Sequence, residues 1–150
     1  MKIRGYWGEL DAPVILAELV CEKLGIKSLI EFLVDTGSSK TIIMGNDFIR
    51  LGLRYSQLQK SEKKSVGIGG AVETYFLPDV KLVFATEDGS THTEIPKRVF
   101  ILKHELKSEE NEEMIKKIPS LLGRDILDKY TLVVSKKKKL VLITDKEVGL

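Results

Sequence analysis

The sequence predicts a mostly β protein with a few short helices. Runs rich in Val, Ile, Leu and Phe recur along the chain, and polar or glycine-containing turns separate them. The helical signals between these runs are short, so strands supply most of the expected structure. Hydrophobic residues make up 43% of the 150 residues, which is enough for a buried core. We therefore expect one all-β domain over residues 1–150.

The chain begins with a predicted hairpin. Residues 12–21 and 28–34 are rich in strand-compatible side chains, and the segment Glu22-Lys23-Leu24-Gly25 supplies the turn between them. The second strand runs directly into small polar residues at 35–39, which suit a tight turn, and then into a further strand at 41–44. Strand, polar loop and strand therefore follow one another here.

A short helix and a glycine-rich hairpin follow. Asn46 is expected to cap a helix over residues 47–51, because its side chain can accept from the free amides of the first turn. Gly52 suits the left-handed conformation that ends such a helix. Residues 65–77 predict a hairpin with a glycine-rich tip, and a strand at 80–85 comes after it.

The last third of the chain continues the same pattern. The Asp-Gly pair within residues 87–90 favours a tight turn, and a strand over 93–102 follows, in which Pro96 indicates an edge position or a bulge. Ser108 is expected to cap a helix that Pro119 stops. The remaining elements are one or two helical turns and a closing hairpin, at residues 126–130, 131–134 and 140–144.

The composition limits the expected binding partners and cellular location of the protein. The formal net charge is +2, from 24 basic and 22 acidic residues, which gives no general attraction to nucleic acid or to a membrane. A single cysteine, Cys21, can form neither an intramolecular disulfide nor a cysteine-based zinc site, and no apolar run is long enough to span a bilayer. The start of the chain lacks the apolar core of a signal peptide. We therefore expect a cytoplasmic protein.

Asp35 is the strongest candidate for chemistry. A carboxylate directly after a buried strand lies in a partly desolvated loop. Removing a charge from water costs free energy, so a carboxylate in such a loop indicates a function. An ordinary polar turn is the alternative interpretation. Apolar residues before Asp35, the hydroxyl of Thr36 and the close approach that Gly37 permits all favour a functional loop.

Three separated blocks give the chain its resemblance to a known family. The first is Asp35-Thr36-Gly37-Ser38 after an apolar strand, continuing through Thr41-Ile42-Ile43. The second is Gly67-Ile68-Gly69-Gly70, and the third is Leu121-Leu122-Gly123-Arg124-Asp125-Ile126-Leu127. In this order they resemble the retropepsin-like aspartic peptidases, and the cellular and prokaryotic members more than the viral ones. The resemblance implies an all-β, closed-barrel-like fold with short helices. It also implies a homodimer that hydrolyses a peptide or protein substrate without a metal or cofactor.

The resemblance assigns roles to Asp35 and Thr36 of the first block, and the chemistry of Ser38 suggests a further one. Asp35 of each subunit faces its own copy, and the two carboxyl groups share one proton because both cannot ionise comfortably at close range. The charged partner takes a proton from a water, and the protonated partner donates towards the oxyanion. Thr36 bonds across the dimer axis. Ser38 is expected to donate to ionised Asp35, which would favour the charged form and shift activity to lower pH.

The other two blocks are expected to cover and support the loop. Gly67, Ile68, Gly69 and Gly70 would form a flap over substrate, although an ordinary flexible hairpin is the alternative interpretation. The third block, with Leu121, Leu122 and Gly123, would pack beneath the catalytic loop. Arg124 lacks the aspartate that pairs with it in viral members, because Ser39 and Lys40 stand there, so its partner stays open. Asp125 is expected to cap the following helix.

Two rival functions stay open. A noncatalytic dimeric peptide-binding module could keep the same fold, although it has no need for a proton-sharing aspartate pair. The basic run at residues 136–139 could bind nucleic acid, but without interleaved aromatic residues it favours a solvated turn or a protected sheet edge. His92 and His104 stand alone, without the spacing of a metal site.

Overall fold

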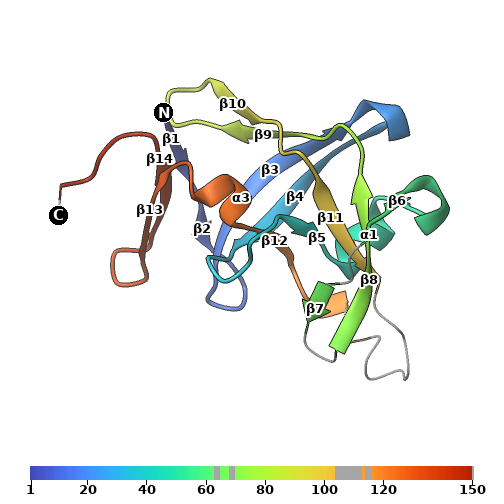
Figure 1. The fold of residues 1–150 in the computed structure, drawn as a ribbon. Helices are drawn as coiled ribbons and strands as arrows, with labels where there is room; N and C mark the ends of the chain where they lie inside the picture. Colours follow the sequence, from blue (N-terminus) through green and yellow to red (C-terminus); the bar gives the residue numbers. More distant parts are fainter. Residues whose placement is uncertain (63–64, 68–69, 104–112, 114–115, 150) are drawn as a thin grey trace.

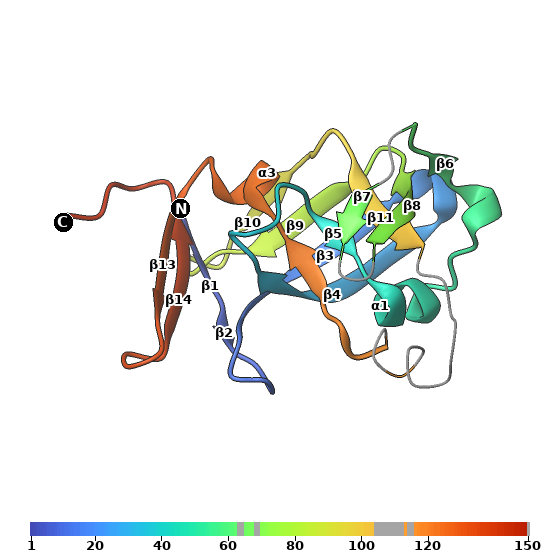
Figure 2. The same cartoon turned by 60° about the horizontal axis from the view of Figure 1, so that its bottom comes forward.

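The computed structural model describes residues 1–62, 65–67, 70–103, 113 and 116–149, and strands dominate it (Figure 1). Within these described residues, the strands form a three-stranded sheet and an eleven-stranded sheet. In both views the small sheet lies at one end of the molecule with the two termini, and β6 and β8 lie towards the other end (Figures 1 and 2). The chain is therefore elongated along the large sheet.

Apart from β3 and β4, with nine residues each, and β8, with eight, the described strands and helices have six residues or fewer. The strands are β1 (Lys2–Arg4), β2 (Tyr6–Trp7), β3 (Pro13–Cys21), β4 (Ile26–Val34), β5 (Ile42–Ile43), β6 (Gln59–Lys60), β7 (Ser65–Gly67), β8 (Gly70–Leu77), β9 (Lys81–Ala85), β10 (Thr91–Glu94), β11 (Val99–Lys103), β12 (Ser120–Leu122), β13 (Thr131–Ser135) and β14 (Leu140–Thr144). The helices are α1 (Gly45–Arg50) and α3 (Arg124–Leu127), with 3-10 turns at Glu22–Leu24 and Tyr55–Gln57.

The predicted hairpin at the start of the chain is confirmed. Strands β3 and β4 pair antiparallel, and the turn between them ends at Gly25, whose φ of 66° requires the left-handed conformation that glycine adopts freely. Side chains alternate along β3, so that Ile15, Ala17 and Leu19 lie in the core. Cys21 is also fully buried, as expected of a small core residue.

The centre of the large sheet joins segments that are far apart in sequence. Its strands run in the order β10-β9-β3-β4-β12-β5-β11-β8-β6. The short strand β12 lies between β4 and β5, parallel to β4 and antiparallel to β5. The residues around 120 therefore lie beside the strand that ends in Asp35.

The expected barrel closure is wrong. Within the described residues, β10 and β6 end the large sheet, and the terminal hairpin belongs to a separate sheet with β1. A closed barrel needs every strand to pair on both sides in a fixed stagger. The end strands, of four and two residues, pair on one side only, so the sheet stays open.

Two local predictions are also corrected. The single strand expected over residues 93–102 is two strands, β10 and β11, which pair with different neighbours. Pro96 between them lacks an amide hydrogen and cannot continue a ladder. Helix α1 begins at Gly45, so Met44 rather than Asn46 occupies the N-cap. Gly52, with a φ of 68°, follows the helix as predicted.

Ser120 explains how α1 starts without a cap of its own. Its hydroxyl accepts from the Met44 amide at 3.0 Å and donates to Asp47 at 2.6 Å, so a distant strand fixes the first turn. The closing hairpin β13–β14 is confirmed. The helix expected between Ser108 and Pro119 lies mostly outside the described residues. In this stretch the described residues 113, 116 and 117 are helical.

A buried polar cluster connects β10 to the segment after α3. Glu94 is 6% exposed and accepts from Tyr130, His92 and Lys129. Burial alone would raise the pKa of Glu94, but these hydrogen bonds and the Lys129 charge outweigh it and hold the pKa below its ordinary 4.5. Burial, followed by the Glu94 carboxylate, raises the pKa of Tyr130 above its usual value.

We predict that Glu94→Gln lowers the free energy of unfolding near neutral pH by about 1–3 kcal/mol, because Tyr130 and Lys129 lose a charged acceptor. The folded pKa of Glu94 lies below the unfolded one, so this contribution is present above pH 4.5 and is lost as the pH falls through the folded pKa. Urea denaturation at neutral and acidic pH measures the difference, with exposed Glu147→Gln as the control. An undiminished difference in acid would contradict the prediction.

Candidate active site

Asp35 follows β4 directly and is half-buried. Its amide donates to the Leu122 carbonyl at 3.0 Å, which continues the parallel pairing of β4 and β12. Its Oδ1 accepts from the Gly37 amide at 2.9 Å. The backbone therefore sets the orientation of this carboxylate, and no flexible side chain is needed to hold it.

The residues after Asp35 form a tight loop. The Ser38 amide donates to the Asp35 carbonyl at 3.2 Å, and Thr36 and Gly37 are exposed. The Ser38 hydroxyl donates to the Lys40 carbonyl at 2.7 Å. The expected bond from Ser38 to the Asp35 carboxylate is therefore not the one made. Ser38 stabilises the turn into β5 instead, and the proposed effect of this hydroxyl on the charge of Asp35 loses its geometric basis.

Gly123 lies against the backbone of the same loop. A Cβ at this position would come within 2.3 Å of the Lys40 carbonyl oxygen and 2.8 Å of the Lys40 nitrogen. The Gly123 amide also donates to the Thr41 hydroxyl at 3.2 Å. Only glycine allows the two backbone segments to approach so closely.

Arg124 finds its partner within the chain. Its guanidinium donates to the Thr36 carbonyl at 2.7 Å, and its amide donates to the Ser38 carbonyl at 2.8 Å. The partner of Arg124 is therefore a backbone carbonyl. The side chain bridges from the start of α3 to the tip of the loop, and the loop is held at two carbonyls by one residue.

Asp125 holds the exit of the loop. Its carboxylate accepts from the Thr41 amide at 3.0 Å and the Thr41 hydroxyl at 2.8 Å. It also accepts from the Ile126 amide at 3.0 Å, a bond at the start of α3. Sequence reasoning did not connect Thr41 with Asp125, because 84 residues separate the two and no local pattern links them.

The glycine-rich hairpin is present where its backbone is described. Strands β7 and β8 pair antiparallel, with Gly67 opposite Gly70. Ile68 and Gly69, the other two residues predicted for the flap, lie outside the described residues.

One face of the large sheet carries a continuous line of apolar side chains, which we call the apolar row. Residues directly opposite one another in neighbouring strands point to the same face. The ladder aligns, in order across the sheet, Leu33, Leu121, Ile42, Phe100 and Phe76. The alternate residues Val34, Leu122 and Ile43 lie in the core. The row therefore lies on the face opposite the core, and Asp35 comes two residues after its member Leu33.

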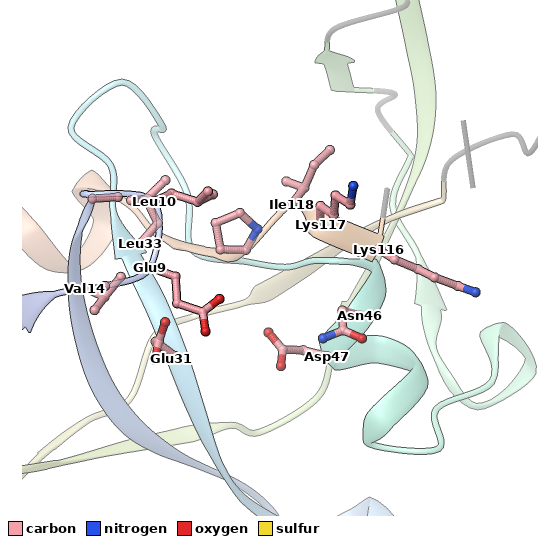
Figure 3. A pocket seen from close by; sticks show the side chains of 13 residues that line it. Glu9, Leu10, Val14, Glu31, Leu33, Asn46, Asp47, Lys116, Lys117 and Ile118 are labelled. Carbon is pink, nitrogen blue, oxygen red and sulfur yellow. The ribbon is translucent and has the colours of Figure 1, made fainter. Parts of the chain in front are cut away.

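A hollow of about 650 Å³ opens beside this row (Figure 3). Leu33 and Pro119 line it together with residues of the loop between β2 and β3. Figure 3 shows the carboxylates of Glu9, Glu31 and Asp47 around the same opening. Sequence reasoning did not identify these three, because they come from separate elements.

Tyr6 holds one of these carboxylates. Its hydroxyl donates to Glu31, and burial together with that carboxylate raises the pKa of Tyr6 to about 12. Among the described residues, no group of three His, Cys, Asp or Glu side chains is arranged to hold a metal ion. No helix in the described ranges is both long and apolar enough to cross a membrane.

Comparison of the sequence with known protein families gives a match over most of the chain. The model of the retroviral aspartyl protease family matches residues 16–134, a range that contains the loop of Asp35, the glycine hairpin and β12. No curated protein sequence matches the chain.

Solved structures give a second comparison. The chain is similar to a retropepsin-like aspartic protease from Rickettsia conorii, with a TM-score of 0.52 and 19% identity, over 95% of this chain and 89% of that one. It is also similar to the EIAV protease complexed with the inhibitor HBY-793, with a TM-score of 0.45 and 18% identity over 78% and 86% of the two chains. The third is the retroviral protease-like domain of Ddi1 from Leishmania major, with a TM-score of 0.44 and 12% identity over 90% and 98%. The Rickettsia likeness shows the retropepsin fold.

Proposed function

Because this chain belongs to the retroviral aspartyl protease family, we propose that it is an aspartic endopeptidase whose one catalytic dyad is built by Asp35 from each of two identical subunits. The observation that carries the proposal is the seating of Asp35. Its carboxylate is fixed by the Gly37 amide, in a loop that β12 and α3 hold from beneath. Each subunit would act as one domain over residues 1–150.

The chemistry requires two such carboxyl groups about 3 Å apart, which cannot both ionise comfortably and so share a proton. The ionised group takes a proton from a water as that water attacks the peptide carbonyl, and the protonated group donates to the developing oxyanion. Preorganisation matters here, because small displacements of reacting groups reduce rates steeply. Arg124 and Asp125 supply that preorganisation through the backbone of the loop.

Two surface features support the homodimer. Thr36 is exposed at the tip of the loop, where its hydroxyl can bond to the partner's loop. Strand β13 pairs with β14 along one edge, and within the described chain no strand covers the other. Val134 on this strand is 42% exposed. A free edge with an apolar side chain is a surface that a second copy can cover by antiparallel pairing about a two-fold axis.

The substrate would bind as an extended strand. The apolar row offers a floor for its side chains, and the β7–β8 hairpin, with the proposed flap residues Gly67, Ile68, Gly69 and Gly70, offers backbone groups for pairing. The substrate would then be recognised through both its backbone and its side chains. This mode of binding suits an endopeptidase that cuts unfolded or flexible segments.

Digestion of a diverse peptide mixture tests the proposal. The wild-type dimer is incubated with the mixture at several pH values from acidic to neutral, and new peptide ends are identified by mass spectrometry. An Asp35→Asn preparation, purified in the same way, is the control. We expect internal cleavage by the wild type alone. A wild-type dimer that binds peptides but cuts none would instead support a noncatalytic binding module, and equal cleavage by both preparations would assign the activity to another source.

A further inference from the structure

Two aromatic side chains at the far end of the apolar row each carry a cation. The rings of Phe76 and Phe100 lie 6.4 Å apart. The Lys40 ammonium lies 4.2 Å from the centre of the Phe100 ring, and the Arg98 guanidinium carbon lies 4.1 Å from that of Phe76. The two positive charges therefore stand over neighbouring rings on one face of the sheet.

This pair of cations adjoins the loop of Asp35. Lys40 belongs to that loop and follows Asp35 by five residues. Phe100 lies opposite Ile42, which lies opposite Leu121, so a continuous apolar floor runs from Leu33 beside Asp35 to the covered rings. A peptide laid across Asp35 on this face passes within reach of both cations.

The charges of Lys40 and Arg98 are available to a ligand. Both side chains are exposed, and among the described residues neither forms an ion pair. An aromatic ring attracts a cation without neutralising it, so each charge can still bind a carboxylate. The other end of the row differs, because the hollow there is lined by carboxylates, Glu9, Glu31 and Asp47, together with Lys116 and Lys117, so charges of both signs lie around it.

We propose that Lys40 and Arg98 determine substrate specificity by binding an acidic side chain, Glu or Asp, near the scissile bond of the peptide. The carboxylate of that side chain lies between the ammonium and the guanidinium, which are held over Phe100 and Phe76. This inference rests on the proposed endopeptidase function and names the class of peptide that the site selects.

The experiment uses one peptide that the wild type cuts, made in three versions at each position flanking the cut, with Glu, Gln or Lys. We expect one position at which kcat/KM for Glu exceeds that for Gln by about five- to tenfold, and falls further for Lys, as a modest ion pair at a partly exposed site provides. The preference should weaken as salt is added, because screening acts on exposed charges.

Three variants test the assignment, and the Glu-to-Gln ratio within each enzyme is the readout, so that a general loss of activity cancels. Lys40→Gln and Arg98→Gln should each lower the ratio, whereas Lys97→Gln, an exposed neighbour that removes the same charge, should not. A ratio near one at every position in the wild type, or a ratio independent of salt, would overturn the inference. The absence of cleavage of any peptide, including the Gln versions, would instead overturn the proposed function.

Discussion

Asp35→Asn is expected to lower kcat/KM for peptide cleavage by at least about a thousandfold while leaving the dimer intact. The amide of asparagine cannot take a proton from the attacking water, and it cannot share one with the other subunit. It still offers an oxygen to the Gly37 amide, which is the bond that orients Asp35 in the loop. Size-exclusion chromatography and thermal melting should therefore match the wild type, and the loss should appear in cleavage alone.

Mixed dimers make this prediction specific to a shared dyad. If wild type and Asp35→Asn subunits exchange freely, only dimers with two wild-type subunits are active, and activity follows the square of the wild-type fraction. An equal mixture should retain about a quarter of the activity of the same total amount of wild type, whereas independent sites would retain about half. A linear dependence would contradict the shared dyad, provided that exchange is verified with a labelled subunit.

The sequence predicted those elements whose signals are local. The β3–β4 hairpin follows from two strand-forming runs joined by a turn that ends in Gly25, and the β13–β14 hairpin follows in the same way. Gly52 marked the end of α1 because a left-handed residue is specified by its own side chain, or lack of one. Each of these required only neighbouring residues.

The features that could not be predicted depend on contacts between residues far apart in sequence. Asn46 is a good cap by type, but Ser120 from β12 fixes the start of α1, and Met44 takes the cap position. The sequence around Pro96 predicts one strand, because nothing local reveals that β10 and β11 pair with different neighbours. Propensity is a weak guide wherever tertiary pairing determines the outcome.

The candidate site likewise has a local part that the sequence predicts and a long-range part that it does not. The short motif at Asp35 could be found from sequence because its residues are consecutive. Its support could be found only in part. The third block indicated packing beneath the loop, but the partners of Arg124 and Asp125 are the Thr36 carbonyl and Thr41, which become evident only once β12 lies between β4 and β5. A residue that binds backbone carbonyls leaves no complementary side chain for sequence reasoning to detect.

Gly123→Ala is expected to lower the free energy of unfolding by about 2–3 kcal/mol or more, since the added methyl must displace backbone and not merely a side chain. Its Cβ would lie 2.3 Å from the Lys40 carbonyl oxygen, far inside contact distance. The loop of Asp35 would have to move away from β12, and with it the carboxylate.

The shift should also reduce peptide cleavage by about a hundredfold in the variant that remains folded, because a misplacement near 1 Å is enough to lose catalytic geometry. Gly149→Ala is the matched control, since a Cβ there meets no atom within 4 Å. Urea denaturation and kcat/KM should both stay at wild-type values in that control. Gly123→Ala with wild-type stability and activity would mean that the backbones of Gly123 and Lys40 are not in contact, and the support of the catalytic loop from beneath would then need another source.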